Sequence, residues 1–266
     1  MSIEIENKLQ FLHQAWPSNA ILTTSALKAK GFSDQLIQKY CHSGWLQRIG
    51  IGAFVRQNDK ASWQGGLYAI QHDLKKNIHI GGLTALELSG LAHYLGLAPE
   101  KIIYLYNTSS TKSKLPGWFI KYFNQKEIFH YKQCHIFDKE IGLKTQAIES
   151  LEILVSEPER AILELLYLVP EIVSVEHAAN LVENLQTIRP EKMQHMLENC
   201  RHILIKRLFL CLSDLCQLPV LKHLRTNKIT LGSGDRTINV GGKYFPKYKL
   251  VLSYSGSGDL EEDINV

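Results

Sequence analysis

The segment that decides the fold is residues 23–56, with the sequence TTSALKAKGFSDQLIQKYCHSGWLQRIGIGAFVR. Thr24 is predicted to cap a short helix that runs to Lys30, and Gly31 can end that helix because glycine readily adopts a positive φ. A second helix is predicted to begin after a tight turn and to end near Gly44. Two short helices joined so closely indicate a helix-turn-helix motif.

The second helix is predicted to start at the N-cap Ser33, with Phe32 and Ile37 at the two positions of a hydrophobic staple. At about 100° per residue, its side chains separate into two faces. The apolar face holds Leu36, Ile37, Tyr40 and Cys41. The polar face holds Gln35, Gln38, Lys39 and His42. Glutamine and lysine can hydrogen-bond adenine and guanine in the major groove, so this face has the chemistry to read DNA.

A tight hairpin follows the second helix directly. Two strand-like runs, at 45–49 and 53–56, are joined by the turn Gly50-Ile51-Gly52. Helix, turn, helix and hairpin is the order of elements in a winged helix-turn-helix, and helix-turn-helix proteins bind DNA through their second helix. The sequence therefore predicts a DNA-binding module near the N-terminus.

The predicted DNA-binding surface makes two kinds of contact. The polar helix face reads base edges, while hydroxyl groups, the hairpin arginines and a hairpin glycine hold the phosphate backbone. The predicted residues are Thr24, Ser25, Ser33, Gln35, Gln38, Lys39, His42, Arg48, Gly50 and Arg56. Any surface helix also has a polar face, so a merely solvated helix is one alternative. A winged helix that binds only other proteins is another.

Length and composition limit the class of protein. A chain of 266 residues is long enough for two domains, and a composition of 45% hydrophobic and 21% charged residues excludes disordered, collagen-like and disulfide-stapled proteins. The formal charge of +4 does not by itself indicate a nucleic-acid partner. An odd count of five cysteines, no basic leader and no long apolar stretch predict a cytoplasmic protein without a membrane partner.

The pattern beyond the hairpin predicts a second, mixed domain and an α+β fold. The predicted divisions are a winged-helix domain at 1–95, a mixed α/β domain at 96–254 and an acidic, flexible tail at 255–266. Strands are predicted at 102–106, at 118–123 and within 228–254, and helices from 156 to about 215. Ser156 and Glu159 have the spacing of a capping box at the first of these helices.

Positive charge is concentrated near the end of the second domain. Residues 201–254 hold ten lysines and arginines but only two acidic residues, a net charge of about +8. A basic face is predicted from Lys206, Arg207, Arg225, Lys228, Arg236, Lys243 and Lys247. Such a face can bind a phosphate backbone or an acidic surface. The alternative is an ordinary solvated surface that the acidic tail partly balances.

The sequence gives little support to metal binding, a phosphate-binding loop or catalysis. His130, Cys134 and His135 lie close together, but no second half-site has the spacing of metal ligands. The run 241–243 is glycine-glycine-lysine, yet tyrosine follows it where a phosphate-binding loop needs serine or threonine. No nucleophile stands out with a supporting histidine and acid. We therefore predict no metal, no cofactor and no enzymatic activity.

Four segments carry a resemblance to a known family. They are KYCHSGWLQRIGIGAF at 39–54, IHIGGLTALEL at 78–88, SEPERAILELL at 156–166 and GGKY at 241–244. These segments resemble the AbiEi-type antitoxins of abortive-infection type IV toxin–antitoxin systems, which act in phage defence. The resemblance covers nearly the whole chain and stops at the acidic tail. One departure is Ile51 at the hairpin tip, where the family more often has a basic residue, and this puts a strong phosphate contact by the tip in doubt.

The resemblance implies a bacterial transcriptional repressor of its own operon. Its winged helix would bind inverted repeats in double-stranded promoter DNA, where two copies can associate. The domain at 96–254 would be the antitoxin domain, which counters a cognate nucleotidyltransferase toxin. In type IV systems this partnership is functional and requires no stable complex. The alternative is a winged-helix interaction module, or another transcriptional regulator, without antitoxin activity.

Overall fold

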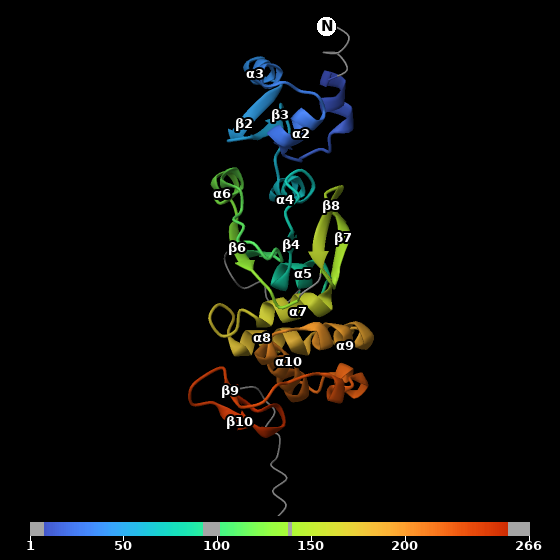
Figure 1. Ribbon diagram of the computed structural model, residues 1–266, viewed down its shortest axis with the longest axis vertical. Helices are drawn as coiled ribbons and strands as arrows, with labels where there is room; N and C mark the ends of the chain where they lie inside the picture. The colour runs from blue at the N-terminus through green and yellow to red at the C-terminus, as the bar shows by residue number, and fades with distance from the viewer. Residues whose placement is uncertain (1–7, 93–101, 138–139, 255–266) are drawn as a thin grey trace, which may run out of the picture. The chain divides into compact units, whose positions relative to one another are not determined.

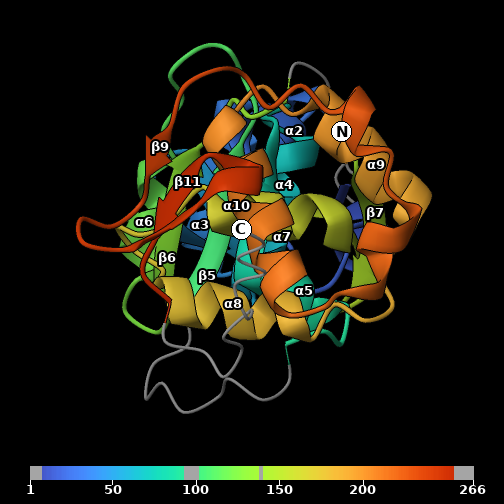
Figure 2. The same ribbon diagram turned by 90° about the horizontal axis from the view of Figure 1, so that it is seen from below.

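The computed structural model describes residues 8–92, 102–137 and 140–254 (Figures 1 and 2). The chain divides into two compact units, each assembled from separate segments. Unit 1 comprises Met1–His79, Glu100–Gln133 and Lys144–Val155, and unit 2 comprises Ile80–Pro99, Cys134–Leu143 and Ser156–Val266. The predicted domain boundary near residue 96 and the predicted tail at 255–266 lie outside the described residues.

Unit 1 begins with a small module of short helices and strands. Its elements are η1 (Phe11–Ala15), β1 (Leu22–Thr23), α2 (Thr24–Ala29), α3 (Asp34–His42), β2 (Leu46–Gly50) and β3 (Ala53–Arg56). The strands form an antiparallel sheet in the order β1-β3-β2. Leu22, Leu27, Ile37 and Phe54 are buried between the sheet and the helices. The predicted pair of helices and the hairpin are confirmed, in the order expected of a winged helix-turn-helix.

The caps of the two short helices follow the prediction at one helix and correct it at the other. Ser33 is the N-cap of α3, and its hydroxyl accepts a hydrogen bond from the Leu36 N–H at 3.2 Å. The N-cap of α2 is Thr23 and not Thr24, because the Thr23 hydroxyl accepts from the Ala26 N–H. Gly31 has a φ of 80° and follows α2 as predicted.

The rest of unit 1 is built around a five-stranded sheet with the order β6-β5-β4-β8-β7. The strands are β4 (Ile78–Ile80), β5 (Ile102–Asn107), β6 (Ile128–Gln133), β7 (Leu143–Ile148) and β8 (Leu151–Ser156). The helix α4 (Trp63–His72) precedes β4, and α6 (Gly117–Phe123) joins the parallel strands β5 and β6. Of these strands, β5 was predicted, whereas β4, β6, β7 and β8 were not.

The run 118–123 is a helix, although its aromatic residues favour a strand. In α6, Trp118, Phe119 and Phe123 are buried. Strand propensity depends on context, and here one helical face buries the large side chains together. The predicted strand at this position is therefore wrong.

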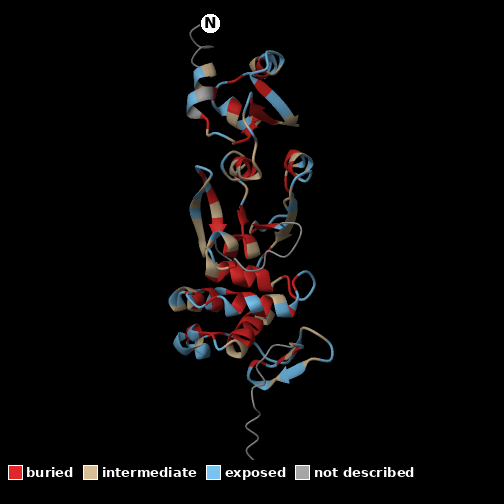
Figure 3. Cartoon of the chain, turned by 180° about the vertical axis from the view of Figure 1, so that it is seen from behind, coloured by how far each residue is buried: buried red, intermediate tan, exposed pale blue. Residues whose placement is uncertain are grey.

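Unit 2 consists of helices packed around a buried one. They are α5 (Gly82–Leu88), α7 (Pro158–Leu166), α8 (Val175–Glu183), α9 (Pro190–Asn199) and α10 (Ile203–Leu215). Every residue of α7 after Pro158 is buried, which Figure 3 shows as a continuous red helix. The helices predicted from 156 to about 215 are confirmed. No helix among the described residues is both long and apolar enough to cross a bilayer.

Polar side chains inside unit 2 hold α7 in place. The Ser156 hydroxyl donates to the Glu164 carboxylate at 2.7 Å, and Arg160 Nε donates to the same carboxylate at 2.6 Å. Both Arg160 and Glu164 are fully buried. Glu157 occupies the N-cap position, and its side chain makes no capping hydrogen bond. The predicted capping box is therefore wrong, because Ser156 bonds an interior carboxylate instead of the helix start.

A small sheet closes the described part of unit 2. It contains β9 (Arg236–Thr237), β10 (Lys243–Phe245) and β11 (Leu250–Leu252) in the order β10-β11-β9, with the 3-10 turns η2 (Pro219–His223), η3 (Thr226–Lys228) and η4 (Pro246–Tyr248) around it. Arg207 of α10 is 1% exposed and anchors this segment. Its guanidinium donates to the carbonyl oxygens of Leu231, Gly232, Gly234 and Lys249.

Two members of the predicted basic face are interior residues. Lys206 is 3% exposed, and burial lowers the pKa of its ammonium group. Arg207 is the buried anchor just described. Neither side chain can present charge on the surface, so both are removed from the basic face. The pattern of apolar residues around them in α10 gave no indication of their burial.

Replacing Arg207 with lysine is expected to destabilise the protein. Lysine keeps the charge but cannot span four carbonyl oxygens with one ammonium group. The free energy of unfolding should fall by about 3 kcal/mol, because several charge-assisted hydrogen bonds are lost. Denaturant unfolding measures this, with exposed Lys243→Arg as the control. An unchanged midpoint for Arg207→Lys would contradict the anchoring role.

Arg56 has a similar role in unit 1. It is 6% exposed, and its guanidinium donates to the carbonyl oxygens of Leu12 and Trp16 and pairs with Asp59 at 2.8 Å. These bonds tie the end of the hairpin to the N-terminal helix.

Replacing Arg56 with glutamine is therefore expected to lower the free energy of unfolding by about 3 kcal/mol, since it leaves Asp59 and two carbonyl groups without their hydrogen-bond donor. Arg48→Gln is the matched control, because Arg48 is an exposed arginine of the same hairpin. Denaturant unfolding of both variants should separate them. Equal stability of the two variants would show that Arg56 does not hold the module together.

Candidate nucleic-acid interface

The helix α3 exposes the polar stripe that the sequence predicted. Gln35, Gln38, Lys39 and His42 are all exposed, while Ile37 and Tyr40 are buried on the opposite side. The His42 ring nitrogen Nδ1 lies 2.8 Å from the carbonyl oxygen of Gln38, one turn earlier. This contact orients the imidazole along the helix. The stripe is therefore an accessible set of amide, ammonium and imidazole groups on one helix face.

The start of α3 is electrostatically balanced. Asp34, in the first turn, forms an ion pair of 2.9 Å with Lys28 of α2. A carboxylate in the first turn also favours the positive end of the helix dipole. Ser33 is exposed but uses its hydroxyl to cap the helix.

The hairpin next to α3 presents one accessible arginine. Arg48 is exposed, and its guanidinium lies 5.2 Å from the centre of the Phe54 ring on the neighbouring strand. Burial raises the pKa of the Cys41 thiol on α3, and the positive charge of Arg48 opposes this rise. The guanidinium of Arg48 therefore lies close enough to α3 to act on it electrostatically.

Two of the predicted backbone contacts, Arg56 and Ser25, have other partners in the structure. Arg56 is buried and bonded within the module, so its predicted contact with phosphate is wrong. The Ser25 hydroxyl lies 3.0 Å from the Thr23 hydroxyl, which donates to Asp73 at 2.8 Å. Thr24 lies beside the hairpin turn, where its N–H donates to the Gly52 carbonyl oxygen at 2.9 Å. Ser25 remains exposed, whereas Thr24 is half-buried.

Gly50 serves a purpose that the sequence did not predict. A Cβ atom at Gly50 would lie only 2.5 Å from Cβ of Trp118 and 3.1 Å from its Cα. The glycine is required at this position because β2 runs against α6. The hairpin is shaped at the turn by a shift in register between Arg48 and Gly50 and by Gly52, whose φ is 73°.

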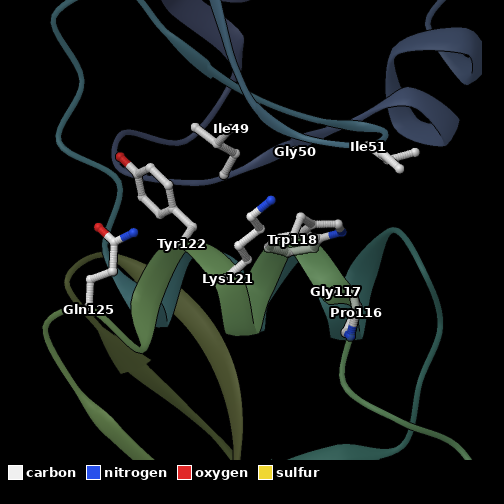
Figure 4. Close-up of a pocket in the computed structure, with 9 residues that line it drawn as sticks. All are labelled: Ile49, Gly50, Ile51, Pro116, Gly117, Trp118, Lys121, Tyr122 and Gln125. Carbon is white, nitrogen blue, oxygen red and sulfur yellow. The ribbon is translucent and has the colours of Figure 1, made fainter.

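A hollow of about 750 Å³ lies where the hairpin meets α6 (Figure 4). Its lining residues are Ile49, Gly50, Ile51, Pro116, Gly117, Trp118, Lys121, Tyr122 and Gln125. Ile51 at the hairpin tip is 94% exposed. No local sequence signal places α6 beside the hairpin, since the two are more than 60 residues apart in the chain. The packing of Gly50 against Trp118 joins two positions that no local sequence pattern links.

Unit 2 keeps part of the predicted basic face. Arg225 and Lys228 are exposed and line a hollow of about 740 Å³ with Arg189 and Lys192 of the α9 region. Gln194 fixes the segment there, because it accepts from the Arg225 N–H at 2.8 Å and donates to the Arg225 carbonyl oxygen. Arg189 and Lys192 lie before the charge-rich segment at 201–254, so the charge of that segment did not predict them.

The remaining predicted cations lie elsewhere. Arg236 and Lys243 are exposed on β9 and β10. Lys247 forms an ion pair of 2.8 Å with Asp214, so its charge is partly neutralised.

Burial raises the pKa of Cys134 to about 12, which keeps this thiol protonated at neutral pH. In the described part of the chain, no group of three histidine, cysteine or acidic residues is placed to hold a metal ion.

Comparisons with known proteins agree with the fold and identify the family. The chain is similar to the crystal structure of the RV2827C protein from Mycobacterium tuberculosis, with a TM-score of 0.61 and 14% identity over 92% of this chain and 89% of that one. At this identity the likeness concerns the fold alone. No curated protein matches the sequence.

Two family models together match nearly the whole sequence. Residues 5–97 match the N-terminal domain of the AbiEi antitoxin transcriptional regulators. Residues 100–253 match the model described as transcriptional regulator, AbiEi antitoxin, type IV toxin–antitoxin system. The chain therefore belongs to the AbiEi antitoxin family of transcriptional regulators from type IV toxin–antitoxin systems.

Proposed function

We propose that this regulator represses its own operon by binding inverted repeats in promoter DNA through α3 and the β2–β3 hairpin. The observation that carries the proposal is the stripe of Gln35, Gln38, Lys39 and His42 exposed on one face of α3. The opposite face of the same helix is buried in the module. The helix is thus held firmly while its polar groups remain free to meet a groove.

The two kinds of side chain have different roles in this proposal. Gln38 lies at the centre of the stripe and can bond adenine through its amide, so it contributes to sequence preference. Arg48 stands on the hairpin beside α3 and can neutralise a phosphate, which contributes to binding of every sequence. Arg56 has no part in the interface, because its donors are bonded inside the module.

Replacing Gln38 with alanine is expected to change which sequences the protein prefers, with a loss of about 1–3 kcal/mol of discrimination at one base pair. Replacing Arg48 with alanine should weaken binding to all duplexes and lower the salt slope by about one unit. Gel shifts on the promoter and on a scrambled duplex, at several salt concentrations, measure both effects.

Thermal unfolding of each variant is the control, since both residues are exposed and the fold should survive. If wild type, Gln38→Ala and Arg48→Ala bind both duplexes equally, the assignment of the interface fails. Absence of promoter binding together with capture of a stable protein partner would instead favour a winged helix for protein interaction.

We propose that unit 2 counters a nucleotidyltransferase toxin through the hollow that Arg225 and Lys228 line. In the same hollow, Arg189 pairs with Glu159 at 2.7 Å and with Glu157 at 3.3 Å, and Lys192 pairs with Glu157. Glu191 and Glu198 also line the hollow, so Arg225 and Lys228 supply positive charge to a lining that carries both signs. Cations in a hollow suit an acidic surface or the phosphates of an RNA that the toxin acts on.

Reversing both charges, Arg225→Glu with Lys228→Glu, is expected to abolish protection of cells that express the toxin. Promoter binding should be unchanged, because the cations lie in unit 2. Lys222→Glu is the matched control, as an exposed lysine of the same segment that does not line the hollow. Growth after toxin induction is the measurement. Full protection by the double variant would remove this hollow from the antitoxin function.

A further inference from the structure

We propose that Lys121 of α6 binds the DNA backbone beside the hairpin and provides the positive charge that the hairpin tip lacks. The inference rests on the proposed binding of promoter DNA. It extends the interface beyond the winged-helix residues to a helix more than 60 residues further along the chain. Three features support it: the packing that fixes α6, the chemistry of the hollow and the exposed lysine within it.

The position of α6 relative to the hairpin is set by close packing. Gly50 of β2 leaves no room for a Cβ atom against Trp118, as described above. On the side of α4, a Cβ atom at Gly66 would lie 2.7 Å from the Phe123 ring and 2.9 Å from the Phe119 ring. Gly50 and Gly66 therefore allow the aromatic residues of α6 to pack closely against β2 on one side and α4 on the other. Such packing holds the helix, and with it Lys121, at a defined place beside the hairpin.

The hollow between the hairpin and α6 has the charge of a site for an anion. Of its nine lining residues, Lys121 is the cation and none is acidic. Figure 4 shows the Lys121 side chain rising from α6 toward β2, between Trp118 and Tyr122. Tyr122 and Gln125 add a hydroxyl and an amide that can hydrogen-bond to phosphate oxygens.

The hairpin tip Gly50-Ile51-Gly52 carries no cation of its own. Ile51 projects into solvent with 94% of its surface exposed, and an aliphatic side chain cannot neutralise a phosphate. Ile51 and Lys121 line the same hollow. A DNA strand that passes the tip therefore comes within reach of the lysine. Because duplex DNA carries about one charge per 1.7 Å along its axis, one well-placed cation is sufficient for a contact.

The test compares Lys121→Gln with Lys126→Gln in the full-length protein. Lys126 is an exposed lysine just after α6 that does not line the hollow, so it is a matched control for general surface charge. Each protein is titrated with the duplex of its own promoter at a series of salt concentrations. We expect Lys121→Gln to weaken binding and to lower the slope of log affinity against log salt by about one unit, while Lys126→Gln behaves as wild type.

The outcomes separate this inference from the proposed function. If Lys121→Gln keeps the wild-type affinity and slope while Gln38→Ala loses sequence preference, the contact by α6 is overturned and DNA binding by α3 stands. Equal losses in Lys121→Gln and Lys126→Gln also overturn it, because a nonspecific charge effect then explains the result. If the wild-type protein does not bind the promoter, the proposed function fails first. Unfolding curves that match wild type confirm that both lysine variants are folded.

Discussion

Burying a guanidinium group is costly unless most of its N–H groups find acceptors, and this requirement organises both units of the protein. Arg56 holds the end of the hairpin to the N-terminal helix through carbonyl oxygens and Asp59. Arg160 pairs with buried Glu164 in the centre of unit 2, and Arg207 collects four carbonyl oxygens of the closing segment. An unpaired buried donor or acceptor is costly, so each arginine defines the path of the chain around it.

The need for acceptors around a buried guanidinium also explains why the charge pattern wrongly predicted some arginines to lie on the surface. Arg48 and Arg56 flank one hairpin and are identical in type, yet the first is exposed and the second is interior. Arg207 and Arg225 likewise belong to one basic segment and have opposite environments. The number of cations in a segment gives no information on distant carbonyl groups. Some of these carbonyl groups accept hydrogen bonds from the cations and allow them to be buried. The surface left for partners is consequently smaller and more localised than the total of ten cations in residues 201–254 indicates.

Local rules predicted the module at 23–56 well because its elements depend on neighbours in sequence. The Ser33 cap, the left-handed Gly31 and the two faces of α3 all follow from spacing within a turn or two. Strands β4 and β6 are different, since they pair with strands that lie far away in the sequence. Strands β7 and β8 are neighbours joined by two residues, but their short runs carry weak signals. The helix α6 was mistaken for a strand because its aromatic residues favour strands until a tertiary contact decides otherwise. For the same reason the hollow beside the hairpin was not foreseen.

The contact between Gly50 and Trp118 bears on how such regulators can diversify. A module that packed only within its own contiguous segment could be exchanged between proteins by replacing that segment. Here the underside of the hairpin fits a helix encoded well downstream, after the end of the first family match at residue 97. A transplanted module would carry α3 and the hairpin but meet a foreign residue at the position of Trp118. Recombination that preserves the packing of this module must therefore carry α6 along with it, or keep both the glycine and the tryptophan unchanged.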